Sequence, residues 1–157
     1  MKNIKSMIAA VLAIAITAIL FTACKKDKPV DLIRRTSAIM SGANETPAVT
    51  SNGTGNIDVA FDPTTKVISY TATWQLGQPT ATTVNMHFHG AETGTDLISS
   101  AVVIGVTGFS TASSGTLSGT TRALTLEEEN QLLAGKWYFN IHSSTVPSGE
   151  LRGNIKF

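Results

Sequence analysis

Apolar and polar side chains alternate from about residue 56 onward, which is the pattern of strands with one buried face. An Asp62-Pro63 turn joins the first two runs and predicts a hairpin, because proline supplies the fixed φ that a turn needs. The positions predicted to point inward are Ile57, Val59 and Phe61 in 56–61; Ile68, Tyr70, Ala72 and Trp74 in 67–74; Val84, Met86 and Phe88 in 83–89; and Val102, Ile104 and Val106 in 100–107.

One helix interrupts the strands in the C-terminal third. Thr125-Leu126-Glu127-Glu128 has the form of a capping box, with a threonine N-cap and a glutamate three residues later. We expect a short helix near 126–134 that buries Leu126, Leu132 and Leu133 and stops at Gly135. Three further strands are predicted: a weak polar one at 115–121; 136–142 with Trp137, Phe139 and Ile141 inward; and 149–157 with Leu151, Ile155 and Phe157 inward.

These elements predict an all-β fold. Roughly seven to nine short strands separated by frequent turns, with one short helix, are typical of an antiparallel β-sandwich or barrel. Gly, Ser and Thr are abundant, but apolar residues return at every strand-sized interval, so the region forms a packed domain.

The N-terminal segment differs from the rest of the chain. Lys2 and Lys5 precede an apolar run at 7–21, which is shorter than the roughly 20 residues that a membrane-spanning helix needs. A basic start, a short apolar run and a small-residue site are the parts of a secretory signal peptide. Residues 1–23 are therefore predicted to be a signal that is removed.

Cys24, the only cysteine, indicates which kind of signal this is. The stretch 20–24 resembles the lipobox of bacterial lipoproteins, although Phe21 stands where leucine is commoner. We expect Cys24 to be lipidated, residues 24–36 to form a charged tether, and the domain to span 37–157, outside the cytoplasm in the cell envelope, facing the periplasm or on the outer membrane. The alternatives are an uncleaved anchor or an ordinary signal with a chance cysteine.

Charge and cysteine content exclude several functions. After removal of 1–23, the chain has ten basic and 11 acidic residues, so it lacks the excess of positive charge that nucleic-acid binding needs. A domain with no cysteine has neither disulfides nor thiolate metal ligands, so its stability must come from its core.

The three histidines lie in two of the predicted strands. His87 and His89 share one face, because side chains two apart on a strand point the same way, and His142 lies opposite Phe139 and Ile141. Imidazole suits zinc and copper, and three protein ligands plus water is a common catalytic arrangement. The three could hold one such ion, with Glu150 as a fourth ligand or supporting partner. The alternative is a hydrogen-bonded polar cluster that needs no cofactor.

No catalytic motif accompanies the histidines. The chain has no G-x-S-x-G elbow and no phosphate-binding loop, so we expect no enzyme. Carboxylate pairs are invisible in one sequence, and the loose candidates are Glu45, Glu92, Asp96 and Glu150.

Four segments in order carry a family resemblance: 41–47 (SGANETP), 86–90 (MHFHG), 135–143 (GKWYFNIHS) and 149–153 (GELRG). The series resembles the CHRD domain, named for chordin, over about residues 37–157. Departures are mild: Phe88 replaces isoleucine, Ser143 replaces threonine, and Pro47 stands where two prolines are common. The polar signature that the resemblance marks is Glu45, His87, His89, Asn140, His142, Glu150 and Arg152.

The resemblance implies an extracytoplasmic β-rich domain without an established activity. One hypothesis is therefore a lipid-anchored binding or structural module whose ligand is an unknown protein or glycan. The other is a metal-binding domain that holds zinc or copper through the histidines and could be an enzyme, either a hydrolase or a redox protein. Copper–zinc superoxide dismutases also place H-x-H on a β-strand, but they need more histidines than this chain has.

Overall fold

The computed structural model describes residues 31–90 and 98–157. The chain divides into two compact units, Met1–Asp31 and Leu32–Phe157, and every element below belongs to the second. Its elements in order are β1 (Arg34–Ser41), the 3₁₀ turn η1 (Gly42–Asn44), β2 (Thr54–Asp62), β3 (Val67–Gln75), β4 (Thr83–Gly90), β5 (Val102–Gly105), β6 (Ser114–Thr120), α2 (Leu126–Leu133), β7 (Trp137–Ser143) and β8 (Leu151–Ile155).

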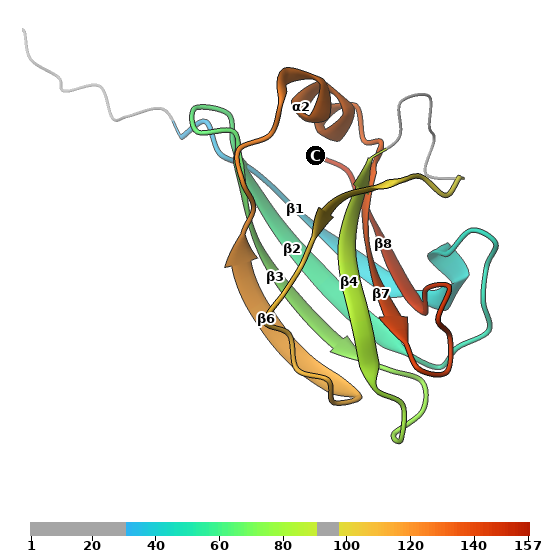
Figure 1. Cartoon of the computed structure of the whole chain (residues 1–157). Helices are drawn as coiled ribbons and strands as arrows, with labels where there is room; N and C mark the ends of the chain where they lie inside the picture. The colour runs from blue at the N-terminus through green and yellow to red at the C-terminus, as the bar shows by residue number, and fades with distance from the viewer. Residues whose placement is uncertain (1–30, 91–97) are drawn as a thin grey trace, which may run out of the picture. The chain divides into compact units, whose positions relative to one another are not determined.

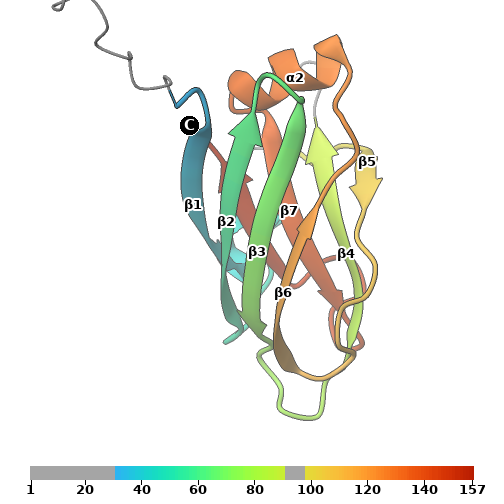
Figure 2. The same cartoon turned by 90° about the vertical axis from the view of Figure 1, so that its left-hand side faces the viewer.

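The described strands form one antiparallel sheet of eight in the order β5-β4-β7-β8-β1-β2-β3-β6. Figures 1 and 2 show the sheet curling around its own interior, with α2 across one end. The predicted all-β antiparallel fold with one short helix is thus confirmed, in the form of a curled half-barrel. No helix among the described residues has the length and apolar character to cross a membrane.

The interior of the half-barrel is filled by the predicted inward positions. The alternation holds closely in β2, β3 and β7, where each predicted residue is buried. Aromatic rings dominate the centre, since Phe88 contacts Tyr70 at a centroid distance of 5.1 Å and Phe139 at 4.9 Å. Burial of such large apolar side chains is the main driving force for this fold.

Two inward assignments near the edge of the sheet are wrong. Val84 is 53% exposed, because a bulge between Thr83 and Asn85 shifts the register of β4 against β7. Val102 is 50% exposed, because a second irregularity between Phe88 and His89 displaces the short strand β5. A bulge changes which face a side chain takes, and alternation does not reveal it.

Three apolar residues at the helix and the C-terminus are also exposed, contrary to prediction. Leu132 is buried, but Leu126 and Leu133 are 65% and 41% exposed. Leu132 is the one buried residue of α2, so the helix packs on the domain through a narrow face and its other side chains are partly or fully exposed to solvent. Phe157 is 40% exposed, because β8 ends at Ile155.

Strand β1 is not predicted by the pattern. Ile39 stands between the inward-facing Ala38 and Met40 and breaks the alternation. It is 74% exposed, whereas Met40 is fully buried. The strand is held by pairing along its whole length with β2, from Arg34↔Phe61 to Ser41↔Thr54.

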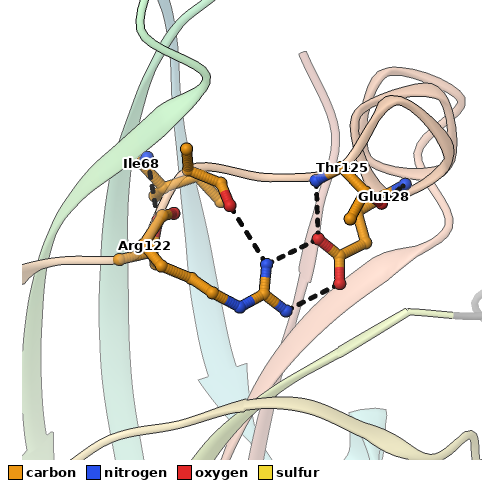
Figure 3. Close-up of polar contacts among 6 residues, drawn as sticks. Ile68, Arg122, Thr125 and Glu128 are labelled. Atoms are coloured by element: carbon orange, nitrogen blue, oxygen red, sulfur yellow. Dashed lines mark hydrogen bonds and ion pairs between the residues drawn. The ribbon is translucent and has the colours of Figure 1, made fainter.

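The predicted capping box opens α2. The Thr125 hydroxyl accepts a hydrogen bond from the Glu128 amide at 3.2 Å, and the Glu128 carboxylate accepts one from the Thr125 amide at 2.8 Å. As Figure 3 shows, the Arg122 guanidinium donates two hydrogen bonds to the same carboxylate, each 2.7 Å long. Gly135, with φ of 71°, follows the end of the helix, as predicted.

Replacing the N-cap tests this construction. We expect Thr125→Ala to lower the free energy of unfolding by about 1 kcal/mol, because the Glu128 amide loses its acceptor. Thr125→Ser keeps the acceptor oxygen and is the matched control. Chemical denaturation of both variants measures the difference, and equal stability of the two would contradict the assigned cap.

Candidate metal centre

The three histidines meet on the outer face of the sheet, where β4 pairs with β7. His87 is opposite Asn140 and Asn85 is opposite His142 in the register, so the rings of both strands project from the same face. One ligand atom from each of His87, His89 and His142 lies within 4.8 Å of the other two. The rings of His87 and His142 are 5.1 Å apart between centroids.

Two of these imidazoles are oriented by backbone carbonyls. His142 Nδ1 lies 2.8 Å from the Pro147 carbonyl oxygen, and His89 Nδ1 lies 2.9 Å from that of Ser100. A carbonyl only accepts, so each Nδ1 carries a proton, and in the neutral ring the lone pair is on Nε2. Histidines that bind metals usually have one nitrogen held in this way, because it fixes the tautomer and ring orientation.

Two imidazole nitrogens in the cluster are buried without a partner. His142 Nε2 and His87 Nδ1 have no hydrogen bond to any described residue. An unsatisfied buried polar atom costs roughly 1–3 kcal/mol. Six side-chain atoms of the described residues are in this state, and these two are the imidazole nitrogens among them. The remaining two nitrogens of the three rings are His87 Nε2 and His89 Nε2. His89 Nε2 lies 3.0 Å from Oδ1 of Asn140, which is an acceptor, so a hydrogen bond there requires a proton on Nε2 as well.

The surroundings of His87 and His89 favour the neutral form of these two imidazoles. Burial lowers the pKa of His87, and the neighbouring His142 and His89 lower it further. Burial also lowers the pKa of His89, against the opposing hydrogen bonds to Ser100 and Asn140. Neutral imidazole is the form that coordinates a metal ion.

The His89 ring is the first member of a stack of three side chains that continues through Tyr138 to Arg152. The imidazole is stacked on Tyr138 at 4.5 Å and 4° between planes, and the Arg152 guanidinium lies 3.5 Å from the centroid of the same tyrosine. Arg152 is fully buried and donates to the Ile98 carbonyl oxygen at 3.1 Å and to Asn154 Oδ1 at 2.9 Å. Such contacts fix the position of His89 relative to β7 and β8.

Glu45 lies close to this network and is buried. Burial raises its pKa, while the Arg152 guanidinium and hydrogen bonding with Asn140 oppose the rise. Gly149 lies against it with φ of 124°, and a Cβ there would be 2.6 Å from Glu45 Oε1. Only glycine fits this position, which explains the glycine that opens the GELRG segment.

Glu150 is not part of the cluster. Its Oε1 accepts hydrogen bonds from Ser51 Oγ at 2.7 Å and the Gly77 amide at 2.6 Å, so its carboxylate ties the β1–β2 and β3–β4 loops together. Burial by itself would raise its pKa, but hydrogen bonding with Ser143, Ser51 and Gly77 outweighs burial and lowers it. The residue has the surroundings of a structural carboxylate.

The outcome for the other candidates is mixed. Cys24, Glu92 and Asp96 lie outside the described residues. The histidines are brought together as the sequence suggested, with Asn140 beside them. Sequence reasoning missed Tyr138 and the two carbonyls of Ser100 and Pro147. The sequence offered one signal for Tyr138, which is that it lies two residues before Asn140 and so on the same face of the strand. It offered no signal for the two carbonyls.

The lowered pKa of Glu150 predicts how its contribution depends on pH. A carboxylate with a depressed pKa stabilises the fold above the unfolded pKa of about 4.5, and the contribution is lost as pH falls through the folded value. We expect Glu150→Gln to cost about 1–3 kcal/mol at pH 7 and progressively less below pH 4.5. Urea titrations across this range measure it, with the exposed Glu127→Gln as control; a pH-independent cost would disprove an ionic role.

Comparison with known proteins identifies the domain. No curated protein and no solved structure matches this chain. The family model of the CHRD domain matches residues 36–155, nearly the whole of the half-barrel. The resemblance seen in the four sequence segments is thereby confirmed, and the chain belongs to the CHRD domain family.

Proposed function

We propose that this CHRD-domain protein binds one transition-metal ion, zinc or copper, through His87, His89 and His142. The observation that carries the proposal is the convergence of three imidazoles with two buried nitrogens that lack a partner among the described residues. An ion would satisfy both nitrogens at once. Imidazole ligands without thiolate suit zinc and copper, and the geometry does not choose between them.

Only small movements separate this arrangement from a coordination site. Nitrogens bound to one zinc ion at about 2.0–2.1 Å lie roughly 3.3–3.6 Å apart, whereas the separations here reach up to 4.8 Å. Rotation of the rings closes this gap, and His89 Nε2 would exchange Asn140 for the ion. The second nitrogens of His89 and His142 keep their carbonyl partners throughout.

The competing hypothesis is that the histidines form a polar cluster in a binding or structural module for a protein or glycan. It leaves His142 Nε2 and His87 Nδ1 buried without compensation. It also predicts that the purified chain keeps no metal. Metal retention therefore separates the two functions.

Metal analysis of the full chain tests the site. After loading with zinc or copper and dialysis, we expect about one equivalent per chain, as for a single three-histidine site, and almost none in His87→Ala/His142→Ala. Gln75→Ala, an exposed change on β3, is the matched control and should retain the ion.

A stability measurement guards against misfolding of the double variant. Saturating metal should raise the Tm of the wild type and not that of the variant, because a ligand at about 100 times its Kd adds about 2.7 kcal/mol. Metal that dialyses away from the wild type, or that both proteins retain equally, would refute the proposal.

We also propose that the domain works outside the cytoplasm, held in the cell envelope by acyl chains on Cys24. The support is the basic n-region, the short apolar run and the single cysteine that follows small residues. Stable anchoring needs two acyl chains or an equivalent pair of signals, which a diacylated cysteine supplies.

Labelling with a fatty-acid analogue in a bacterial host tests the anchor. The wild type should incorporate label and lose residues 1–23, whereas Cys24→Ser should do neither, because it lacks the thiol that receives the diacylglycerol. Phe21→Leu restores the commoner lipobox residue and should be labelled at least as well. Label on Cys24→Ser would show that the lipid is attached elsewhere.

A further inference from the structure

The basic residues of the domain are gathered at one end. Residues 31–157 contain seven lysines and arginines, of which Arg152 is buried in the site. The other six lie where β1 begins, in the β2–β3 turn, between β6 and α2, before β7 and after β8: Arg34, Arg35, Lys66, Arg122, Lys136 and Lys156. The antiparallel register places all of these points at the same end of the sheet.

The opposite end carries no basic residue. Its connections are the segments 42–53, 76–82, 106–113 and 144–150, and none contains lysine or arginine. The half-barrel is therefore polarised along its strands. We call the first end, which bears the six basic residues and α2, the basic end.

Exposed apolar side chains are found at the basic end as well. Leu126 and Leu133 are seven residues apart and so share the outer face of α2, at 65% and 41% exposure. Leu32 precedes β1 and is 57% exposed, and Phe157 follows β8 and is 40% exposed. In Figure 1 the start of β1, the helix and the C-terminus lie at this one end.

The large apolar residues exposed elsewhere in the described part are scattered. They lie along the strands and in the loop before β5: Ile39, Val84, Ile98 and Val102. Ile39 and Val84 lie toward the opposite end, whereas Ile98 and Val102 belong to the connection and the strand that follow β4 from the basic end.

The tether fixes which end faces the membrane. This step rests on the proposed lipid anchor. Cys24 and Leu32 are eight residues apart, and eight residues span at most about 29 Å when fully extended. An acylated Cys24 therefore keeps the basic end within one short tether of the bilayer. The tether adds Lys25, Lys26 and Lys28 against Asp27.

The charges at this end are mixed, so electrostatics alone would bind weakly. Six basic residues stand against seven acidic ones when the β4–β5 connection, which leaves β4 at this end, is counted: Asp31, Asp62, Glu92, Asp96, Glu127, Glu128 and Glu129. Ion pairs neutralise part of this charge, among them Glu129 with Lys66 at 3.0 Å and Glu128 with Arg122 at 2.7 Å. The apolar side chains must therefore supply most of the binding. With the tether included, nine basic residues stand against eight acidic ones, which leaves a slight preference for anionic lipids.

We propose that the basic end docks onto the bilayer that holds the anchor. Leu126, Leu133 and Phe157 enter the headgroup region, and the lysines and arginines lie at the level of the phosphates. The strands then stand away from the membrane surface. The histidine cluster lies on the flank of the half-barrel, between β4 and β7, and stays open to the aqueous side.

Site-directed spin labelling of the full, lipidated chain in vesicles tests the docking. With Cys24 acylated, a new cysteine is the only free thiol, so Leu126→Cys and Phe157→Cys can each be labelled singly. Gln78→Cys, at the opposite end, is the control position. The vesicles mix phosphatidylethanolamine with phosphatidylglycerol, and phosphatidylcholine vesicles serve for comparison.

We expect collisions with a water-soluble nickel chelate to fall several-fold at the labels on 126 and 157, and collisions with oxygen to rise, relative to the label on 78. The effect should weaken in phosphatidylcholine. A Leu126→Glu/Leu133→Glu background should abolish it at position 157, whereas Ile39→Glu, an equally exposed change on β1, should not.

Flotation of the vesicles separates failure of the docking from failure of the anchor. If the chain floats with the vesicles but the labels at 126 and 157 are as open to nickel as that at 78, the docking is wrong and the anchor stands. If the acylated chain does not float, both the anchor and the docking are overturned.

Discussion

The fold of this domain on its outer side depends on one buried charge. Arg152 projects from β8 away from the apolar interior, yet its side chain is fully removed from water. A guanidinium in that position is tolerated only if hydrogen bonds and charges compensate for the lost hydration. The compensation comes from distant parts of the chain: the Ile98 carbonyl, the Tyr138 ring and the nearby carboxyl of Glu45. Segments on either side of the sheet are thereby drawn over its outer face.

This covering makes the histidine cluster a partly buried site. The Tyr138 ring lies between the Arg152 guanidinium and the His89 ring. Ser100 contacts both His89 and Tyr138: its carbonyl oxygen accepts a hydrogen bond from His89 Nδ1, and its amide donates one to the Tyr138 hydroxyl at 3.1 Å. The same contacts that satisfy the arginine orient an imidazole and exclude water around it. A site built in this way is preorganised at His89, because packing and hydrogen bonds hold that ring in one orientation.

The domain has a direction as well as a site. Its basic end carries nearly all of its cationic side chains, its helix and several exposed leucines, while the loops of the opposite end contain neither lysine nor arginine. The candidate metal centre lies between the two ends, on the β4–β7 flank. The proposed attachment near the first residue of the domain and the proposed site on its flank are mutually compatible, since neither obstructs the other.

The sequence by itself determined which face of most strands is buried and how the helix begins. Alternation identified the inward residues of β2, β3 and β7, and Thr125 with Glu128 identified the cap, because these patterns are local and depend only on strand pleat and helix geometry. It also placed His87 and His89 on one face. It failed at Val84 and Ile39, where a bulge or a partner strand overrides the pattern.

Only the tertiary structure decided which strands are neighbours. His142 lies 53 residues beyond His89, and no local rule says that β7 pairs with β4 rather than with another strand. The same pairing brings Asn140 and Tyr138 to the histidines, and the loops that supply Ser100 and Pro147 follow from it. Strand periodicity assigns a side chain to a face, but its contacts depend on register and strand order, which are set by how the whole core packs.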